Sequence, residues 1–412
     1  MKVAVVTAFP PSKVTLNEYG YHLVKNFAQN EEVSELVLIT DHTDEPKQLD
    51  FETGNCKLTV KESWRFNSYK NIYRIYKTIV EEKPDVVFIN LQFMKFGEKK
   101  IPAALGLLLP TLLKFKGFPT VSLLHNILEQ VDLESAGFTK NKIAQKVYNF
   151  IGTTLTRFIL QSDLVAVTIS KYVDVLKTKY KKDNVAQVPH GTFEVPPMPS
   201  MILPAGPKKV MTFGKFGTYK KVEVMIEAIR KIRERSHIDV EVVIAGTDSP
   251  NTPGYLAEVQ DKYKNVENLT FTGYVEEEQV PVIFSESAVV VFPYTSTTGS
   301  SGVLHQAGSY GKAVVMPDLG DLGILVREEG YVGEFFQPED VNSLADAIQR
   351  ILEDDLYRIK LGVKNYKAAC SLPMNEIVDM YMCHFKRAIN KKAPQQSTVK
   401  ESKSRLRIPE AV

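Results

Sequence analysis

Cysteine is scarce in this 412-residue sequence, and its three cysteines, Cys56, Cys370 and Cys383, stand far apart without a Cys-x-x-Cys spacing. This pattern excludes a fold held together by disulfides and a zinc site built from cysteine pairs. It is typical of proteins that work in a reducing cytoplasm. We therefore expect a cytoplasmic protein in which the three thiols are small packing residues.

Long apolar runs and an excess of one charge are also missing. The N-terminal MKVAVVTAFP has too short an apolar run for a secretory signal and predicts a strand instead. The longest apolar stretch, 101–115, contains Pro110 and falls short of the roughly 20 residues that a membrane-spanning helix needs. Lys and Arg number 51 against 49 Asp and Glu, so the net charge of +2 gives no indication of nucleic-acid binding.

Short β-rich apolar runs alternate with longer helical patterns, which predicts an α/β protein with parallel sheets covered on both faces. The predicted strands are 3–7, 36–40, 86–90, 120–125, 164–169, 210–213, 240–245, 269–272, 289–292 and 313–316. The predicted helices include 19–29, 71–82, 142–161, 222–235, 255–264, 279–285, 303–310 and 341–353.

The two halves of this pattern predict two domains. A proline-rich segment without periodicity, GTFEVPPMPSMILPAGP at 191–207, is the expected linker between domain 1–190 and domain 208–370. An amphipathic helix at 371–392 is expected to pack back toward the N-terminal domain. The polar, lysine-rich end of the chain, 393–412, predicts a disordered tail.

The segment 289–317 has the pattern of a phosphate site. A buried strand is followed by a loop of Thr, Ser and Gly, then by a helix that opens near Gly302 and a second buried strand. Backbone N–H groups at such a helix start are unpaired and aligned with the helix dipole, so Ser300, Ser301 and Gly302 are candidate anion ligands. The alternative is an ordinary helix N-cap.

A basic segment, GKFGTYKK at 214–221, follows a predicted strand in the same half of the chain. Two cations there, Lys215 and Lys220, suit the negative charge that builds on a departing diphosphate. The alternative is a pair of solvated lysines at a helix start. Together with the small-residue loop, the segment indicates a nucleoside diphosphate as the ligand.

Five segments, in this order, resemble motifs of the family-4 retaining glycosyltransferases of the GT-B fold. They are GKFGTYKKVE (214–223), GTDSPN (246–251), LTFTGYV (269–275), AGSYGKAVVMPDLGDL (307–322) and GEFFQPEDVNSLADAI (333–348). The resemblance extends over about 1–391 and is stronger in the C-terminal half. It implies two Rossmann-like parallel-sheet domains facing a central cleft, with the acceptor on the N-terminal domain and the nucleotide-sugar on the C-terminal one.

The resemblance also implies roles for individual residues. Gly214, Lys215 (where the family usually has Arg) and Lys220 match the segment that holds the donor diphosphate. The family's pair of glutamates, which have seven residues between them, is replaced by Thr298 and Gln306. Gln306 can still bond the ribose, whereas a threonine hydroxyl only partly replaces a carboxylate near the donor sugar. His125 matches a histidine near the transferred sugar, although a lone histidine after a strand is more often a structural hydrogen-bonder.

Several other positions have weaker assignments. Ser170 fits either a family serine or a helix N-cap, and His190 is predicted to be part of the hinge. The turn 318–321 and the run 276–278 are expected at the surface. Lysines flank the apolar stretch (Lys99, Lys100, Lys114 and Lys116), which fits a core helix with snorkelling ends or a surface that touches anionic membranes.

The function that these patterns favour is nucleotide-sugar-dependent hexosyl transfer with retention of configuration. The donor would be a UDP- or GDP-sugar and the acceptor a carbohydrate or lipid-linked glycan, in polysaccharide or glycoconjugate biosynthesis. Neither a metal nor a cofactor is expected, and the protein would work in the cytoplasm, with peripheral contact at the inner membrane face. The alternatives are a degenerate nucleotide-sugar-binding or partner protein without transferase activity and, ranked last, a GT-B enzyme of another reaction such as epimerisation.

Overall fold

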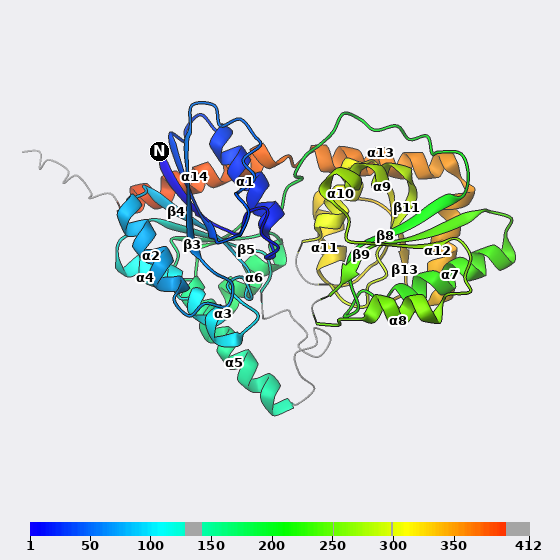
Figure 1. Cartoon of the computed structure of the whole chain (residues 1–412), viewed down its shortest axis with the longest axis horizontal. Coiled ribbons are helices and arrows are strands. Elements are labelled where there is room, and N and C mark those ends of the chain that lie inside the picture. Colours follow the sequence, from blue (N-terminus) through cyan, green and yellow to red (C-terminus); the bar gives the residue numbers. More distant parts are fainter. Residues whose placement is uncertain (128–141, 250, 298–299, 393–412) are drawn as a thin grey trace, which may run out of the picture.

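The computed structural model describes residues 1–127, 142–249, 251–297 and 300–392, and these form two α/β domains side by side (Figure 1). Each domain is built on one parallel sheet with helices on both faces, which confirms the predicted architecture. The predicted tail 393–412 and Thr298 lie outside the described residues.

The N-terminal sheet has seven strands in the order β3-β2-β1-β4-β5-β6-β7. Its strands are β1 (Lys2–Val6), β2 (Glu35–Asp41), β3 (Lys57–Trp64), β4 (Val86–Leu91), β5 (Thr120–Leu124), β6 (Leu164–Val167) and β7 (Val185–Gln187). Its helices are α1 (Asn17–Gln29), α2 (Asn71–Glu82), α3 (Lys100–Gly106), α4 (Leu109–Phe115), α5 (Lys142–Ile159) and α6 (Ser170–Tyr180).

The C-terminal sheet has six strands in the order β10-β9-β8-β11-β12-β13. Its strands are β8 (Lys208–Phe216), β9 (Val240–Asp248), β10 (Leu269–Gly273), β11 (Ser287–Val291), β12 (Ala313–Pro317) and β13 (Glu334–Phe336). Its helices are α7 (Val222–Arg235), α8 (Tyr255–Lys262), α9 (Val280–Glu286), α10 (Gly302–Ser309), α11 (Gly320–Glu329), α12 (Val341–Glu353) and α13 (Asp355–Cys370).

The order of the strands determines where a ligand can bind. In the C-terminal sheet the chain winds from β8 toward β9 on one side and returns to β11 on the other. Loops that leave two such neighbouring strands part in opposite directions and open a crevice at the carboxyl ends of the strands. The crevice between β8 and β11 therefore receives both the basic segment and the small-residue loop.

Three strands were missed by the sequence analysis, and all three are edge strands: β3, β7 and β13. An edge strand pairs on one side only and is partly solvent-exposed, so it lacks the continuous apolar run of a central parallel strand. Strand β7 is also only three residues long.

The apolar stretch 101–115 is two short helices, α3 and α4, rather than one. Pro110 stands in the first turn of α4, where its missing N–H costs nothing, and the chain breaks just before it. Leu107, Leu109 and Leu113 are fully buried in the domain core. These three leucines therefore belong to the core, as the core-helix interpretation predicted, whereas Ile101 and Phe115 at the two ends of the stretch are exposed.

The last helix, α14 (Met374–Lys392), crosses back to the N-terminal domain and runs along it in Figure 1. Its apolar face, which includes Ile377, Tyr381 and Phe385, packs against α1, β4 and β5. The two chain segments that cross between the domains pair with each other, since Thr192 N donates to Leu372 O and Met374 N donates to Thr192 O. The domains are thus joined by a double crossing rather than by a single flexible linker.

Candidate active site

The basic segment 214–221, called here the lysine loop, begins inside a strand. Strand β8 continues to Phe216, beyond its predicted end at 213, and Lys215 pairs in register with Thr247 of β9. The Lys215 side chain is exposed. Gly214 has a φ of 131°, and a Cβ at this position would stand 3.1 Å from Lys220 Nζ. Glycine therefore lets the Lys220 ammonium fold back over the end of β8.

Lys220 faces the loop after β11. Its backbone bridges to Tyr294, and its Nζ lies 4.7 Å from the centre of the Tyr294 ring. The two loops are also joined by Thr295 N, which donates to Tyr219 O at 2.8 Å. Burial lowers the pKa of Lys220, and no carboxylate of the described residues forms an ion pair with it. An ammonium group that is partly buried without a counter-charge is poised to receive an anion.

Helix α10 begins where the sequence predicted. Ser301 is its N-cap, and the Ser301 hydroxyl accepts a hydrogen bond from Leu304 N at 3.3 Å. Ser301 is therefore a helix N-cap, as the alternative interpretation predicted, but its hydroxyl pairs only with the N–H group of Leu304. The N–H groups of Gly302 and Val303 belong to the first turn and have no partner within the helix. Gln306 lies one turn further along α10 and is partly exposed.

His125 follows β5 directly and is almost fully buried. Its Nε2 lies 2.7 Å from Asn90 Oδ1, and Asn90 Nδ2 donates to Thr7 Oγ1 at 3.0 Å. Since the Asn90 oxygen can only accept, Nε2 carries the proton and Nδ1 keeps a lone pair. Burial, with the nearby Lys95 charge, lowers the pKa of His125 to about 3. His125 is thus a neutral, oriented imidazole.

A cluster of buried polar groups lies between the domains, and the sequence analysis did not identify it. The rings of His190 and His305 stack at 4.8 Å, and Tyr19 packs edge-on against both His125 and His190 at 4.6 Å. His305 Nε2 lies 2.8 Å from Glu329 Oε2, and its Nδ1 lies 2.8 Å from Ser301 O. The predicted hinge residue His190 is therefore connected to the start of α10.

A pocket opens between the two domains beside this cluster, and we call it the hinge pocket. Residues that line it are Glu18 and His22 of α1, the crossing segment His190–Glu194, Glu277 before α9, and Gly302 and Gln306 of α10. Glu18 and His22 are four residues apart and so share one face of α1. That spacing is the only feature of the sequence that links these two residues. It does not show which residues of the other domain lie opposite this face of α1.

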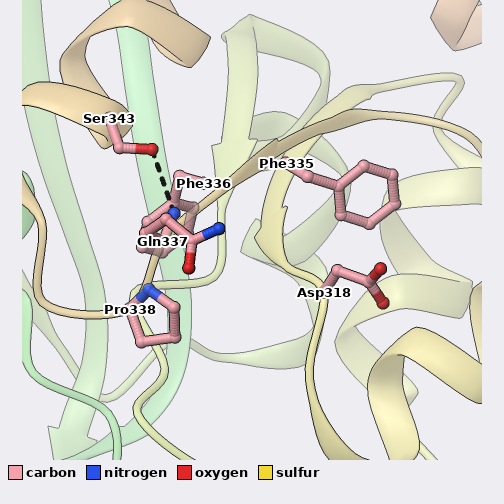
Figure 2. A pocket seen from close by; sticks show the side chains of 6 residues that line it. All are labelled: Asp318, Phe335, Phe336, Gln337, Pro338 and Ser343. Atoms are coloured by element: carbon pink, nitrogen blue, oxygen red, sulfur yellow. Dashed lines mark hydrogen bonds between the residues drawn. The ribbon is translucent and has the colours of Figure 1, made fainter.

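A second hollow lies within the C-terminal domain (Figure 2). It is formed by the ends of β12 and β13 and the start of α12, where Ser343 Oγ accepts from Gln337 N at 3.0 Å. Asp318 on its rim pairs with Arg327. None of the predicted site residues lines this hollow.

Two minor assignments require correction. Asp321, expected at the surface, is 1% exposed and accepts a hydrogen bond from Tyr172 OH across the domain interface. Ser170 is not an N-cap, because its hydroxyl bonds to Glu328 of α11 instead. Both contacts join α6 to α11. The domain interface buries Tyr172 and Asp321, which a single-domain pattern cannot show.

No helix of the described residues is both long and apolar enough to cross a membrane. Over the same residues, no group of three or more acidic, cysteine or histidine side chains is arranged to hold a metal ion.

The chain is similar to a known sequence family and to known structures. Residues 207–354 match the sequence family described as glycosyl transferases group 1. No curated protein sequence matches the chain.

Solved structures match almost the whole chain. Sucrose-phosphate synthase from Thermosynechococcus elongatus has a TM-score of 0.72 at 16% identity, over 95% of this chain and 100% of that one. Anabaena HepE, solved with UDP and glucose, has a TM-score of 0.65 at 16% identity, over 94% and 100%. WaaG, a glycosyltransferase involved in lipopolysaccharide biosynthesis, has a TM-score of 0.63 at 11% identity, over 93% and 99%. The chain therefore has the GT-B fold of these structures, and its residues 207–354 match the family of group 1 glycosyl transferases.

Proposed function

We propose that this protein is a hexosyltransferase that moves a sugar from a nucleoside-diphosphate donor to a carbohydrate or lipid-linked acceptor with retention of configuration. The observation that carries the proposal is the unpaired Lys220 ammonium, which packs against Tyr294 in the loop that leads to α10. The lysine loop and the loop that leads to α10 follow neighbouring parallel strands, β8 and β11. A positive charge and unpaired helix N–H groups therefore lie at the same edge of the sheet, which suits the binding of a diphosphate.

The donor binds along the C-terminal side of the cleft. Lys220 and the exposed Lys215 hold the diphosphate, with backbone N–H groups at Ser300, Ser301 and Gly302 opposite them. Gly214 allows the phosphates to approach the end of β8, and Gln306 bonds the ribose. The UDP bound in the HepE structure supports a uridine nucleotide as the first donor to test.

Transfer takes place on the face of the sugar from which the diphosphate leaves. The leaving phosphate oxygen accepts the proton of the attacking hydroxyl, and the new glycosidic bond forms as the bond to phosphate breaks. Lys220 and the α10 N–H groups stabilise the charge that develops on the diphosphate. His125, neutral and fixed by Asn90, accepts a hydrogen bond from the sugar through Nδ1.

The exposed surface of α3, α4 and α5 in the N-terminal domain, which would hold the acceptor, supports an acceptor located at a membrane surface. The segments 99–118 and 142–159 contain basic residues and no Asp or Glu. Ile101 and Phe115 of α3 and α4, and Val147, Phe150 and Ile151 of α5, are exposed there. Apolar side chains among lysines match an anionic lipid surface, which supports a lipid-linked acceptor and peripheral binding.

The proposal is tested by donor turnover in the Lys220→Ala variant. We expect kcat with UDP- or GDP-sugars to fall about 100-fold, as for the loss of one group that stabilises a developing oxyanion. Lys221→Ala is the matched control, because Lys221 Nζ lies over Tyr255, away from the loop after β11. A Lys220→Ala kcat above about one tenth of wild type would remove the assigned role.

A nucleotide-sugar-binding protein without transferase activity is the second candidate. It is favoured by one observation, the replacement of both family glutamates by Thr298 and Gln306. Calorimetry with UDP, GDP and ADP, run beside donor hydrolysis and transfer assays, separates the two. Tight binding without turnover of any donor would favour this candidate.

A further inference from the structure

The hinge pocket contains carboxylates that the transfer mechanism does not use. Glu18 comes from α1 of the N-terminal domain, Glu194 from the crossing segment and Glu277 from the C-terminal domain. Glu194 pairs with Lys25 at 2.7 Å. In the described parts of the chain, Glu18 and Glu277 form no ion pair. Two carboxyl groups from opposite domains therefore line one pocket, and neither is held by an ion pair in the described residues.

Glu18 is in an unfavourable environment in the unliganded pocket. Its Oε1 is buried and, among the described residues, has no hydrogen-bond partner. Burial, with a smaller contribution from the charge of Glu277, raises the pKa of Glu18 to about 7. A buried acceptor without a donor destabilises the folded protein, so a donor supplied by a ligand would be favourable.

His22 provides a second, independent group. It is 6% exposed, stacks on Phe193 with ring centres 4.5 Å apart, and lines the pocket. Its Nδ1 is buried and likewise lacks a partner in the described structure. Burial lowers the pKa of His22 to about 4, so the ring is neutral and does not offset the carboxylates.

We propose that the hinge pocket binds the ammonium group of an amino sugar, between Glu18 and Glu277 and beside His22. An ammonium group has three donors and a positive charge, which match two carboxylates on opposite walls and an imidazole lone pair. A metal ion fits less well, because no group of three or more suitable ligands is formed by the described residues. The pocket reaches Gly302 and Gln306 at the donor site, so this inference rests on the proposed function and specifies its substrate.

Calorimetry with glucosamine at pH 6, where the sugar amine is protonated, tests the proposal on protein saturated with UDP. We expect glucosamine to bind at least about tenfold more tightly than glucose or N-acetylglucosamine, since a charge-assisted bond adds that much. Glu18→Gln and Glu277→Gln should each weaken glucosamine binding by about tenfold or more. Glu278→Gln, a neighbouring exposed carboxylate outside the pocket, is the matched control and should leave binding unchanged.

Proton release on glucosamine binding distinguishes direct contact between Glu18 and the ammonium group from a purely structural role of Glu18. Glu18 is mostly protonated at pH 6, since its pKa is about 7. An ammonium group that binds beside it should therefore displace roughly one proton, measured as a difference in binding heat between two buffers. The release should disappear in Glu18→Gln.

The outcomes separate this inference from the proposed function. Equal binding of glucose and glucosamine, or glucosamine binding unaffected by both variants, would overturn the ammonium site even where UDP binds normally. Failure to bind any nucleotide would instead overturn the proposed function, and titration of glucosamine alone would still test the pocket.

Titration of UDP-glucosamine against UDP-glucose tells whether the amine belongs to the donor, and glucosamine binding beside UDP assigns it to the acceptor. A third result would also contradict the inference. If GDP binds more tightly than UDP and Glu277→Gln abolishes this preference, the carboxylates bind guanine instead of an amino sugar.

Discussion

The imidazole rings of His190 and His305 stack across the domain interface, with centres 4.8 Å apart and planes inclined by 30°. His305 belongs to the helix whose first turn faces the proposed diphosphate, and His190 to the segment that joins the domains. Their environments differ. Burial would lower the pKa of His305, but the nearby Glu329 carboxylate raises it overall, whereas burial and the His305 charge lower the pKa of His190.

Replacement of Glu329 should therefore change stability in a pH-dependent way. A histidine with a raised pKa stabilises the fold below its unfolded pKa, near 6.5, and this contribution is lost as pH rises through the folded pKa. Glu329→Gln should lower the unfolding free energy by about 3 kcal/mol near pH 6, with a smaller effect near pH 9. Urea unfolding of both proteins across this range measures the difference. A difference that does not depend on pH would mean that His305 is neutral in the fold.

His125 should contribute to kcat without titrating near neutral pH. Because its pKa is lowered to about 3, the ring is neutral throughout the range from pH 5 to pH 8. His125→Gln should reduce kcat about 10- to 100-fold through loss of a positioned acceptor, while UDP affinity stays near wild type. The pH–rate profiles of the two proteins should have the same shape. An inflection near pH 6.5 in wild type that the variant lacks would contradict a neutral His125.

Removal of divalent metal should leave transfer intact. In the proposed mechanism, the Lys220 ammonium and the first N–H groups of α10 stabilise the negative charge of the diphosphate without a metal. After treatment with EDTA, we expect kcat to stay within about twofold of the untreated enzyme. If EDTA abolished activity and Mg²⁺ or Mn²⁺ restored it, these groups would not be sufficient to stabilise the leaving diphosphate.

The exposed face of α5 should bind anionic vesicles. Phe150 is 72% exposed and lies among basic residues, so it can insert beside lipid headgroups. We expect sedimentation with phosphatidylserine-containing vesicles at low salt, weaker binding at high salt, and about tenfold weaker binding by Phe150→Ser. Leu356→Ser is the matched control, because Leu356 is equally apolar and 81% exposed but lies on α13 of the other domain. Equal loss in both variants would mean that hydrophobicity alone, rather than this face, drives binding.

Local patterns in the sequence determined most of the fold. Central strands such as β4 and β11 are buried on both faces, so their apolar runs are continuous and were predicted to within a residue or two. The helices α2, α7 and α12 were predicted with their observed bounds, because their apolar residues repeat with the helical period. Edge strands such as β13 were missed, since a strand that pairs on one side needs no such run.

By itself, the sequence determined most of the helices, the central strands of both sheets, and the lysine and small-residue loops, because each depends on residues close together in the chain. The tertiary structure alone decided which polar side chains meet across the domains, as Glu18 meets Glu277 and His190 meets His305. These residues are more than 100 positions apart, and no local pattern encodes the packing of one domain against another. The pKa shifts of Glu18, His190 and His305 follow from burial and from the charged groups brought next to them, which is why the hinge pocket became visible only in three dimensions.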